Sequence, residues 1–160
     1  MNDRLDTIAA ILRTNEQVFH NAIADVTESA WLHRPGDSNH LAFLATHLVA
    51  ARHYTVRFAG GTSTDPLEVY HGGARDIGEM SQFPSVQETM GAWHEVAPIL
   101  RDTLDAVTEG FLDEDHSLPF PAPGPINLDV LTFLAQHEAY HLGQIGLLRR
   151  ILGLPATKWR

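Results

Sequence analysis

The feature that most constrains the fold is an apolar pattern with the period of an α-helix, which recurs in four separate stretches of the chain. In the first stretch the apolar residues follow one another at steps of three, four and seven, which places them on one face of a helix; they are Leu5, Ile8, Leu12, Phe19, Ile23 and Val26. The same reasoning predicts long helices over residues of about 3–25, 40–59, 86–109 and 127–152. Because no stretch alternates like a strand, we predict an all-α fold, a four-helix bundle formed by a single domain over residues 1–160.

The connection between the second and third predicted helices is long and irregular. It covers residues 60–84, begins with two glycines and shows no sustained period, so we expect a loop with at most a short turn of structure. A helix of about 24 residues is roughly 36 Å long, and this segment can span that length. The two helices can therefore lie parallel, joined by an overhand connection. Candidate N-caps are Ser38 and Asn39 for the second helix, and Ser85 in a capping box with Glu88 for the third.

The charge and the composition disfavour several classes of protein. The formal net charge is −9 and no cluster of Lys and Arg exceeds a pair, so a nucleic-acid backbone would be repelled. No apolar run approaches the roughly 18 residues needed to cross a bilayer, and the first residues lack the layout of a secretory signal. We therefore expect a cytoplasmic protein without a membrane partner. Cysteine is absent, so any thiol chemistry needs a sulfur that a small molecule brings.

Histidine is frequent, with ten residues, and three of them fall on faces that are predicted to point into the core. On a helical wheel, His137 and His141 lie near the middle of the apolar stripe of the fourth helix, and His47 lies on the apolar face of the second. His53 is turned by roughly 120° from His47, toward positions that we expect to be more exposed. The three inward imidazoles can meet across a bundle in which facing helices lie about 8–10 Å apart.

Two interpretations of these three histidines are open. A single buried histidine is most often hydrogen-bonded to backbone or hydroxyl groups and binds no metal. Burying three imidazoles without partners is costly, however, and one divalent ion would satisfy all of them. Three protein ligands leave the fourth position of the ion to water or substrate, as in a catalytic site. We therefore predict a divalent metal site at His47, His137 and His141.

Residues 137–141 read HEAYH, which matches the His-Glu-x-x-His pattern of zinc peptidases. Such peptidases need a third ligand downstream, but no Asp or Glu follows Glu138 and no His follows His141. The extended metzincin pattern also fails, because Gln144 and Leu147 stand where glycine and histidine are required. A peptidase is therefore disfavoured. Glu138 is kept as a candidate for catalysis, and a solvated carboxylate at the edge of the helix is the alternative that we favour for it.

Two segments carry a resemblance to a known family. The segments NHLAFLATHLVAARHY (residues 39–54) and HEAYHLGQIGLLRRILG (residues 137–153) resemble the two signature helices of the DinB-like (DinB/YfiT) superfamily of metal-dependent enzymes. The resemblance covers essentially the whole chain, and its most specific part is the His-x-x-x-His-x-Gly-Gln pattern. The metal triad of the family falls on His47, His137 and His141, the residues that the helical wheel selects.

The resemblance implies a four-helix bundle with an overhand connection, often a homodimer, that binds zinc, nickel or another divalent ion. Characterised relatives include bacillithiol S-transferases and a mycothiol-dependent isomerase, so it also implies a low-molecular-weight thiol as cofactor and a small-molecule substrate. Gln144, close to the histidine face, could orient a ligand or a water molecule. Tyr54, two turns from His47, could contact substrate. Ordinary packing is the alternative for both side chains.

Three functional hypotheses result. The first is a metal-dependent enzyme that transfers a small thiol, such as bacillithiol or mycothiol, to an electrophilic substrate. The second is a metal-dependent hydrolase that uses metal-bound hydroxide and needs an acid or base beside the ion. The third is a nonenzymatic bundle that binds metal for stability or sensing.

Overall fold

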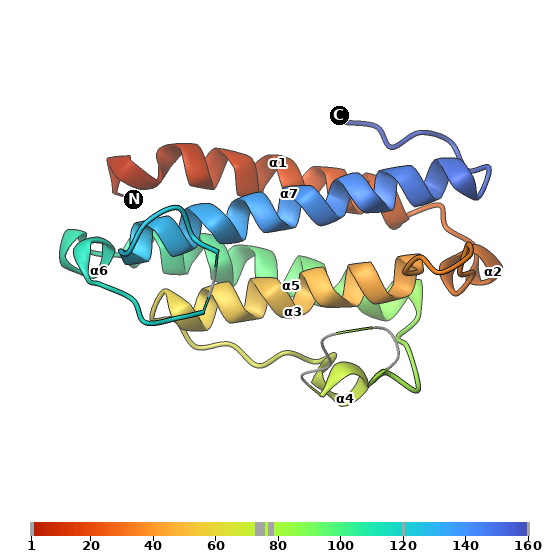
Figure 1. Cartoon of the computed structure of the whole chain (residues 1–160), viewed down its shortest axis with the longest axis horizontal. Coiled ribbons are helices and arrows are strands. Elements are labelled where there is room, and N and C mark those ends of the chain that lie inside the picture. Colours follow the sequence, from red (N-terminus) through yellow and green to blue (C-terminus); the bar gives the residue numbers. More distant parts are fainter. Residues whose placement is uncertain (1, 73–75, 77–78, 120, 160) are drawn as a thin grey trace.

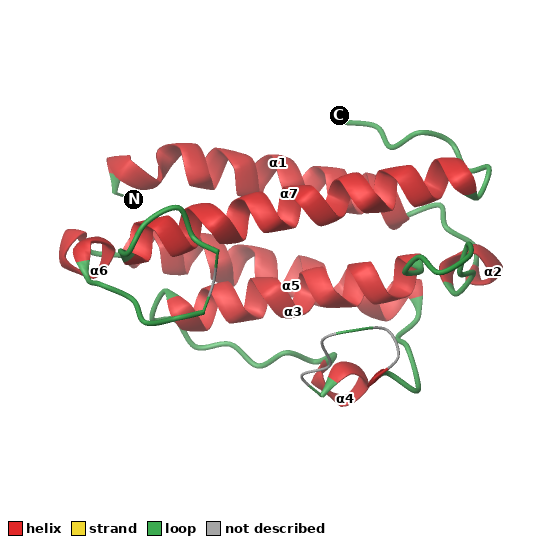
Figure 2. Cartoon of the chain, in the orientation of Figure 1, coloured by secondary structure: helices red, strands yellow, loops and turns green. Residues whose placement is uncertain are grey.

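Four long helices lie side by side in the computed structural model, which describes residues 2–72, 76, 79–119 and 121–159 (Figure 1). They are α1 (Asp6–Ile23), α3 (Leu41–Phe58), α5 (Val86–Ala106) and α7 (Asn127–Ile151). Short helical segments precede or separate them: η1 (Asp3–Leu5), α2 (Glu28–Trp31), α4 (Glu68–His71) and α6 (Glu109–Asp113). The described residues contain no strand, only an isolated bridge between Asp115 and Ile126 (Figure 2). The predicted all-α class is therefore confirmed.

Each long helix packs against two others. α1 contacts α7 and α5, and α3 contacts α5 and α7. Two groups of buried apolar side chains fill the interior: the larger includes Phe19, Trp31 and Trp93, and the smaller includes Leu104 and Leu131. The rings of Phe19 and Trp93 stack with their centroids 3.9 Å apart, which fixes α1 against α5. None of the described helices is both long and apolar enough to cross a membrane.

The predicted N-cap of α5 is confirmed, and the predicted N-cap of α3 is wrong. Ser85 caps α5 as predicted, because its hydroxyl accepts a hydrogen bond from the Glu88 N–H and the Glu88 carboxylate accepts one from the Ser85 N–H. α3 is capped by His40 and not by either of the two residues before it. Nδ1 of His40 accepts a hydrogen bond from the Phe43 N–H at 3.0 Å, and the ring packs edge-on against Phe83. The predicted cap is wrong because burial holds the His40 ring over the first turn of α3, where Nδ1 meets the free N–H groups.

Some helix ends also differ from the prediction. Residues 3–5 form a 3-10 turn instead of the first turn of α1. The third long helix ends at Ala106, since Thr108 accepts a hydrogen bond from the Phe111 N–H and starts the separate helix α6. The fourth long helix begins at residue 127, as predicted, and ends at residue 151, one residue before the predicted end.

The connection from α3 to α5 contains α4 and is otherwise irregular where it is described. Residues 73–75 and 77–78 of this connection lie outside the described residues. The first part runs alongside α3, and α4 packs against α3 (Figure 1). This arrangement brings side chains of α4 to the same pocket as side chains of α3 and α7.

Candidate metal centre

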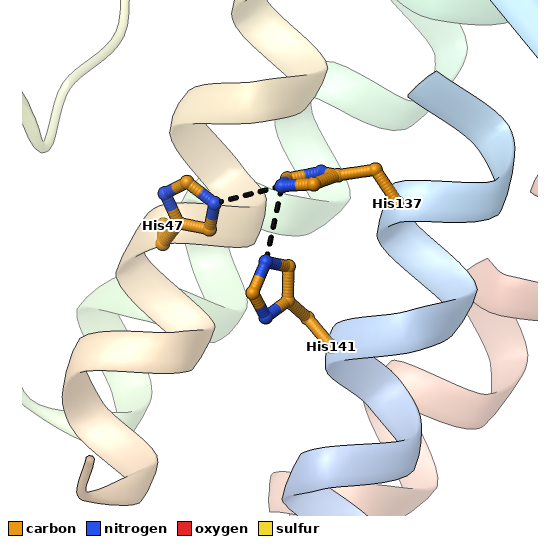
Figure 3. A group of neighbouring side chains, drawn as sticks. All are labelled: His47, His137 and His141. Atoms are coloured by element: carbon orange, nitrogen blue, oxygen red, sulfur yellow. Dashed lines mark hydrogen bonds between the residues drawn. The ribbon is translucent and has the colours of Figure 1, made fainter. Parts of the chain in front are cut away.

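His47, His137 and His141 bring their Nε2 atoms together between α3 and α7 (Figure 3). Nε2 of His137 lies 3.1 Å from Nε2 of His47 and 3.0 Å from Nε2 of His141. His137 and His141 are one turn apart on α7, so their spacing gives them a common direction. His47 comes from a distant part of the chain and reaches them because α3 packs against α7. The structure thus brings together the three histidines that the sequence singled out.

Hydrogen bonds among the three rings do not account for this arrangement. A ring nitrogen of a neutral imidazole either carries one hydrogen or offers one lone pair. Nε2 of His137 has two nitrogen neighbours at hydrogen-bond distance, so it cannot form a good hydrogen bond to both. One divalent cation that accepts a lone pair from each Nε2 would satisfy all three nitrogens. The donor set therefore fits a divalent metal ion.

The three rings are kept neutral, as metal ligands must be. Burial lowers the pKa of His47 to about 4, and the imidazoles of His141 and His137 add to the effect. Burial and the neighbouring His141 also lower the pKa of His137 to about 4. Burial lowers the pKa of His141 as well, although its hydrogen bond to Gln144 opposes the shift. At neutral pH each ring can offer a lone pair to a cation.

The Nδ1 atoms of His137 and His141, which do not take part in the cluster of three Nε2 atoms, differ in their hydrogen bonding. Nδ1 of His141 lies 2.6 Å from Oε1 of Gln144. An amide oxygen only accepts hydrogen bonds, so Nδ1 of His141 carries the proton and its Nε2 keeps the lone pair that a metal needs. Nδ1 of His137 is buried and has no hydrogen-bond partner among the described residues. Such an unpaired atom costs about 1–3 kcal/mol, so His137 is not a core histidine that is simply satisfied by its surroundings.

A pocket of about 430 Å³ opens beside the three histidines. Two of the three form part of its wall, together with Tyr54 of α3 and Phe133 of α7. Glu68 and His71 of α4 also line it. Its volume falls in the range of small-molecule sites. A small ligand in this pocket would lie against His47 and His137.

The family comparison agrees with this geometry. A model of the DinB superfamily matches residues 11–145, a region that contains all three histidines. The chain belongs to the DinB superfamily. Proteins of the DinB superfamily generally bind metal ions. No curated protein matches the chain.

A second group of side chains in this DinB-superfamily chain was not identified from the sequence. Asp65, Glu68 and His71 each offer one ligand atom, and these atoms lie within 4.8 Å of one another. Nε2 of His71 is 2.8 Å from Oδ2 of Asp65 and 3.6 Å from Oε2 of Glu68. The hydrogen bond to Asp65 raises the pKa of His71. The only sequence signal was their regular spacing, three residues apart, within a segment that otherwise reads as a loop.

His53 does not occupy the exposed position that the helical wheel predicted. Its exposed fraction is 2%. Nδ1 of His53 is within hydrogen-bond distance of the Ser63 hydroxyl, while Nε2 is 3.9 Å from Oδ1 of Asp65 and has no hydrogen-bond partner among the described residues. Burial lowers the pKa of His53 despite the nearby carboxylate. The prediction is wrong because the segment after α3 folds back over the side of the helix that the wheel assigned to solvent.

Glu138 is not a solvated carboxylate at the edge of α7, so this expectation is also wrong. Its exposed fraction is 3%, and that of its partner Arg52 is 2%. Nε and Nη2 of Arg52 donate to the two oxygens of Glu138 at 2.8 and 2.9 Å. The guanidinium also lies 3.6 Å above the Trp93 ring and donates to the Leu12 carbonyl. The glutamate of the HEAYH segment therefore joins α7 to α3, because a buried arginine provides the partner that a buried carboxylate requires.

Proposed function

We propose that this member of the DinB superfamily is a metal-dependent enzyme in which His47, His137 and His141 bind one divalent ion, zinc or nickel. The scaffold that we infer is a four-helix bundle with an overhand connection between α3 and α5. The observation that carries the proposal is the convergence of three Nε2 atoms beside a pocket of about 430 Å³. Three protein ligands leave a position for a water or a substrate, which distinguishes a catalytic site from a closed structural site.

The reaction that we propose is transfer of a low-molecular-weight thiol, such as bacillithiol or mycothiol, to an electrophilic small molecule. When bound, a divalent ion lowers the pKa of a coordinating thiol or water, so that a nucleophile exists near neutral pH. The chain has no cysteine of its own, which is consistent with a sulfur supplied by the cofactor. We infer that the enzyme acts in the cytoplasm as a homodimer.

The side chains around the triad take separate roles in this proposal. Gln144 fixes the tautomer and the orientation of His141 through the hydrogen bond to Nδ1. Tyr54 lines the pocket next to His47 and would contact the substrate. Glu138, with both oxygens bonded to Arg52, positions α7 against α3 instead of moving a proton.

One observation favours the alternative of a metal-dependent hydrolase. A hydrolase needs a group that transfers a proton beside the ion. His71 lines the same pocket as His47 and His137, and the Asp65 carboxylate holds its pKa above the ordinary value. Hydrolysis that proceeds without any thiol, and that fails in a His71→Gln variant, would support this alternative over thiol transfer.

The test begins with metal content. The protein, purified without a histidine tag, is analysed for metals next to His47→Ala, His141→Ala and the control His33→Ala, which removes an exposed histidine. We expect about one equivalent of metal to be lost in the first two variants and kept in the control, with the helical circular dichroism signal unchanged. The loaded parent is then assayed with bacillithiol or mycothiol and a fluorogenic alkyl halide. Full metal affinity without His47 or His141 would refute the triad, and turnover that does not depend on thiol would refute the transferase.

A further inference from the structure

The cluster of Asp65, Glu68 and His71 has the geometry of a cation site. Two ligands of one ion, each about 2.0–2.2 Å from it, lie roughly 3 Å apart. Nε2 of His71 is 2.8 Å from the Asp65 carboxylate and 3.6 Å from the Glu68 carboxylate, which brackets that separation. The residues come from the end of a loop and the single turn of α4, so their backbone positions are close in sequence.

His53 supplies an independent sign that a ligand belongs here. Its side chain is 3% exposed, and so is that of Asp65. Nε2 of His53 lies 3.9 Å from Oδ1 of Asp65, too far for a hydrogen bond, and has no hydrogen-bond partner among the described residues. If Nδ1 donates to the Ser63 hydroxyl, Nε2 keeps an unused lone pair 3.9 Å from the Asp65 carboxylate, where a bound ligand could satisfy it. A buried, unpaired ring nitrogen costs about 1–3 kcal/mol unless something satisfies it.

We propose that Asp65, Glu68 and His71 form a second divalent-cation site on the wall of the same pocket as the three histidines, with Nε2 of His53 close beside the Asp65 carboxylate. The site does not depend on the triad, because the two share no ligand. Its set of one imidazole and two carboxylates fits zinc, cobalt or manganese better than calcium or magnesium, which take oxygen ligands only.

A cation at this place would change the charge of the pocket. Glu68 and His71 line the pocket, and the Asp65 carboxylate lies 2.8 Å from Nε2 of His71. Without a cation the two carboxylates would repel a negatively charged ligand. With a dication they are neutralised, and the pocket accepts an anionic small molecule. If these residues bind no cation and serve only to hold α4 against α3 through ion pairs, the negative charge of the pocket stays as it is.

The test counts Co²⁺ equivalents by equilibrium dialysis and follows the visible absorption of the bound ion. Four proteins are compared: the parent, the Asp65→Asn/Glu68→Gln variant, His141→Ala, and all three substitutions together. Asparagine at position 65 can still accept the hydrogen bond from the Leu67 N–H, so the loop keeps that contact. The matched control is Glu28→Gln/Asp102→Asn, which removes two exposed carboxylates from α2 and α5.

We expect two equivalents of Co²⁺ in the parent and in the control, and none in the variant with all three substitutions. Asp65→Asn/Glu68→Gln and His141→Ala should each bind one equivalent, and the absorption spectra of these two variants should differ. One equivalent in the parent, lost in His141→Ala and kept in Asp65→Asn/Glu68→Gln, would overturn the second site and leave the triad intact. Two equivalents that persist in Asp65→Asn/Glu68→Gln would overturn it as well. One equivalent that is lost only in Asp65→Asn/Glu68→Gln would instead support the second site and refute the triad.

The double variant could fail to fold, since Asp65 is buried. Glu68→Gln alone avoids this difficulty because the side chain of Glu68 is 62% exposed. We expect at least tenfold weaker binding of the second Co²⁺ equivalent in this variant, with the first equivalent and the helical signal unchanged. Equal affinity for both equivalents in the parent and in Glu68→Gln would remove Glu68 from the site and overturn the proposed ligand set.

Discussion

Replacing Glu138 by glutamine tests whether the glutamate of the HEAYH segment supports the fold or the chemistry. The substitution keeps the shape of the side chain and removes its charge. In the native protein both oxygens accept hydrogen bonds from Arg52, and both residues are almost completely buried, with exposed fractions of 3% and 2%. In the variant, one oxygen becomes an NH₂ group that faces an N–H donor of Arg52, so one hydrogen bond is lost and the guanidinium keeps its charge without its main counterion.

The expected loss of stability follows from these contacts. Losing one hydrogen bond to a charged group costs about 1.5–3 kcal/mol. Leaving a buried charge without its partner brings the usual total to about 3–5 kcal/mol. Arg52 keeps the Leu12 carbonyl, the Trp93 ring and a Glu16 oxygen at 3.8 Å, so we expect the lower end of that range, about 3 kcal/mol. For a chain of this size this corresponds to a decrease of roughly 6–12 °C in Tm.

The assay is urea unfolding of the metal-free protein, followed by circular dichroism, with Glu95→Gln as the matched control on an exposed helix position. The control should change the free energy of unfolding by less than about 0.5 kcal/mol. The Arg52→Met/Glu138→Leu variant should recover much of the loss, because apolar residues can replace a buried ion pair. A Glu138→Gln protein that is as stable as the parent and keeps its metal, but has lost turnover, would refute the structural role and return Glu138 to the chemistry.

Three further outcomes are expected. The pKa values of His47 and His137 are about 4 in the folded protein and 6.5 in a free peptide, so between these pH values the unfolded chain binds more protons than the folded one. The metal-free protein should therefore lose stability as the pH falls from about 6.5 to 4. The urea midpoint should depend less steeply on pH in a His47→Gln/His137→Gln variant, and an equal slope would contradict the lowered pKa values. Gln144→Ala should weaken metal binding about 10–100-fold by competition with a chelator, whereas the exposed Gln136→Ala should not. Ser85→Ala should cost about 1 kcal/mol in urea unfolding through the lost cap of α5, and no measurable cost would mean that the cap is dispensable.

Much of the fold and the core of the candidate site followed from the sequence because they depend on local geometry. The helical period places His137 and His141 one turn apart on an inward stripe and gives His47 an inward direction on its own helix. The capping box at Ser85 also depends on neighbouring residues alone, and it was predicted correctly. The periodic stretches likewise gave the long helices, with errors of a few residues at their ends.

Only the tertiary structure decided which side chains meet and which faces are covered. The helical wheel assigned one buried stripe to each helix, but α3 is covered by α5, α7, α2 and α4. His53 therefore became buried beside Asp65, and Arg52 reached Glu138 from a helix 86 positions earlier in the chain. A buried charge is tolerated only where its partner is present, and that partner is set by how the helices pack and not by the residues next to it in sequence.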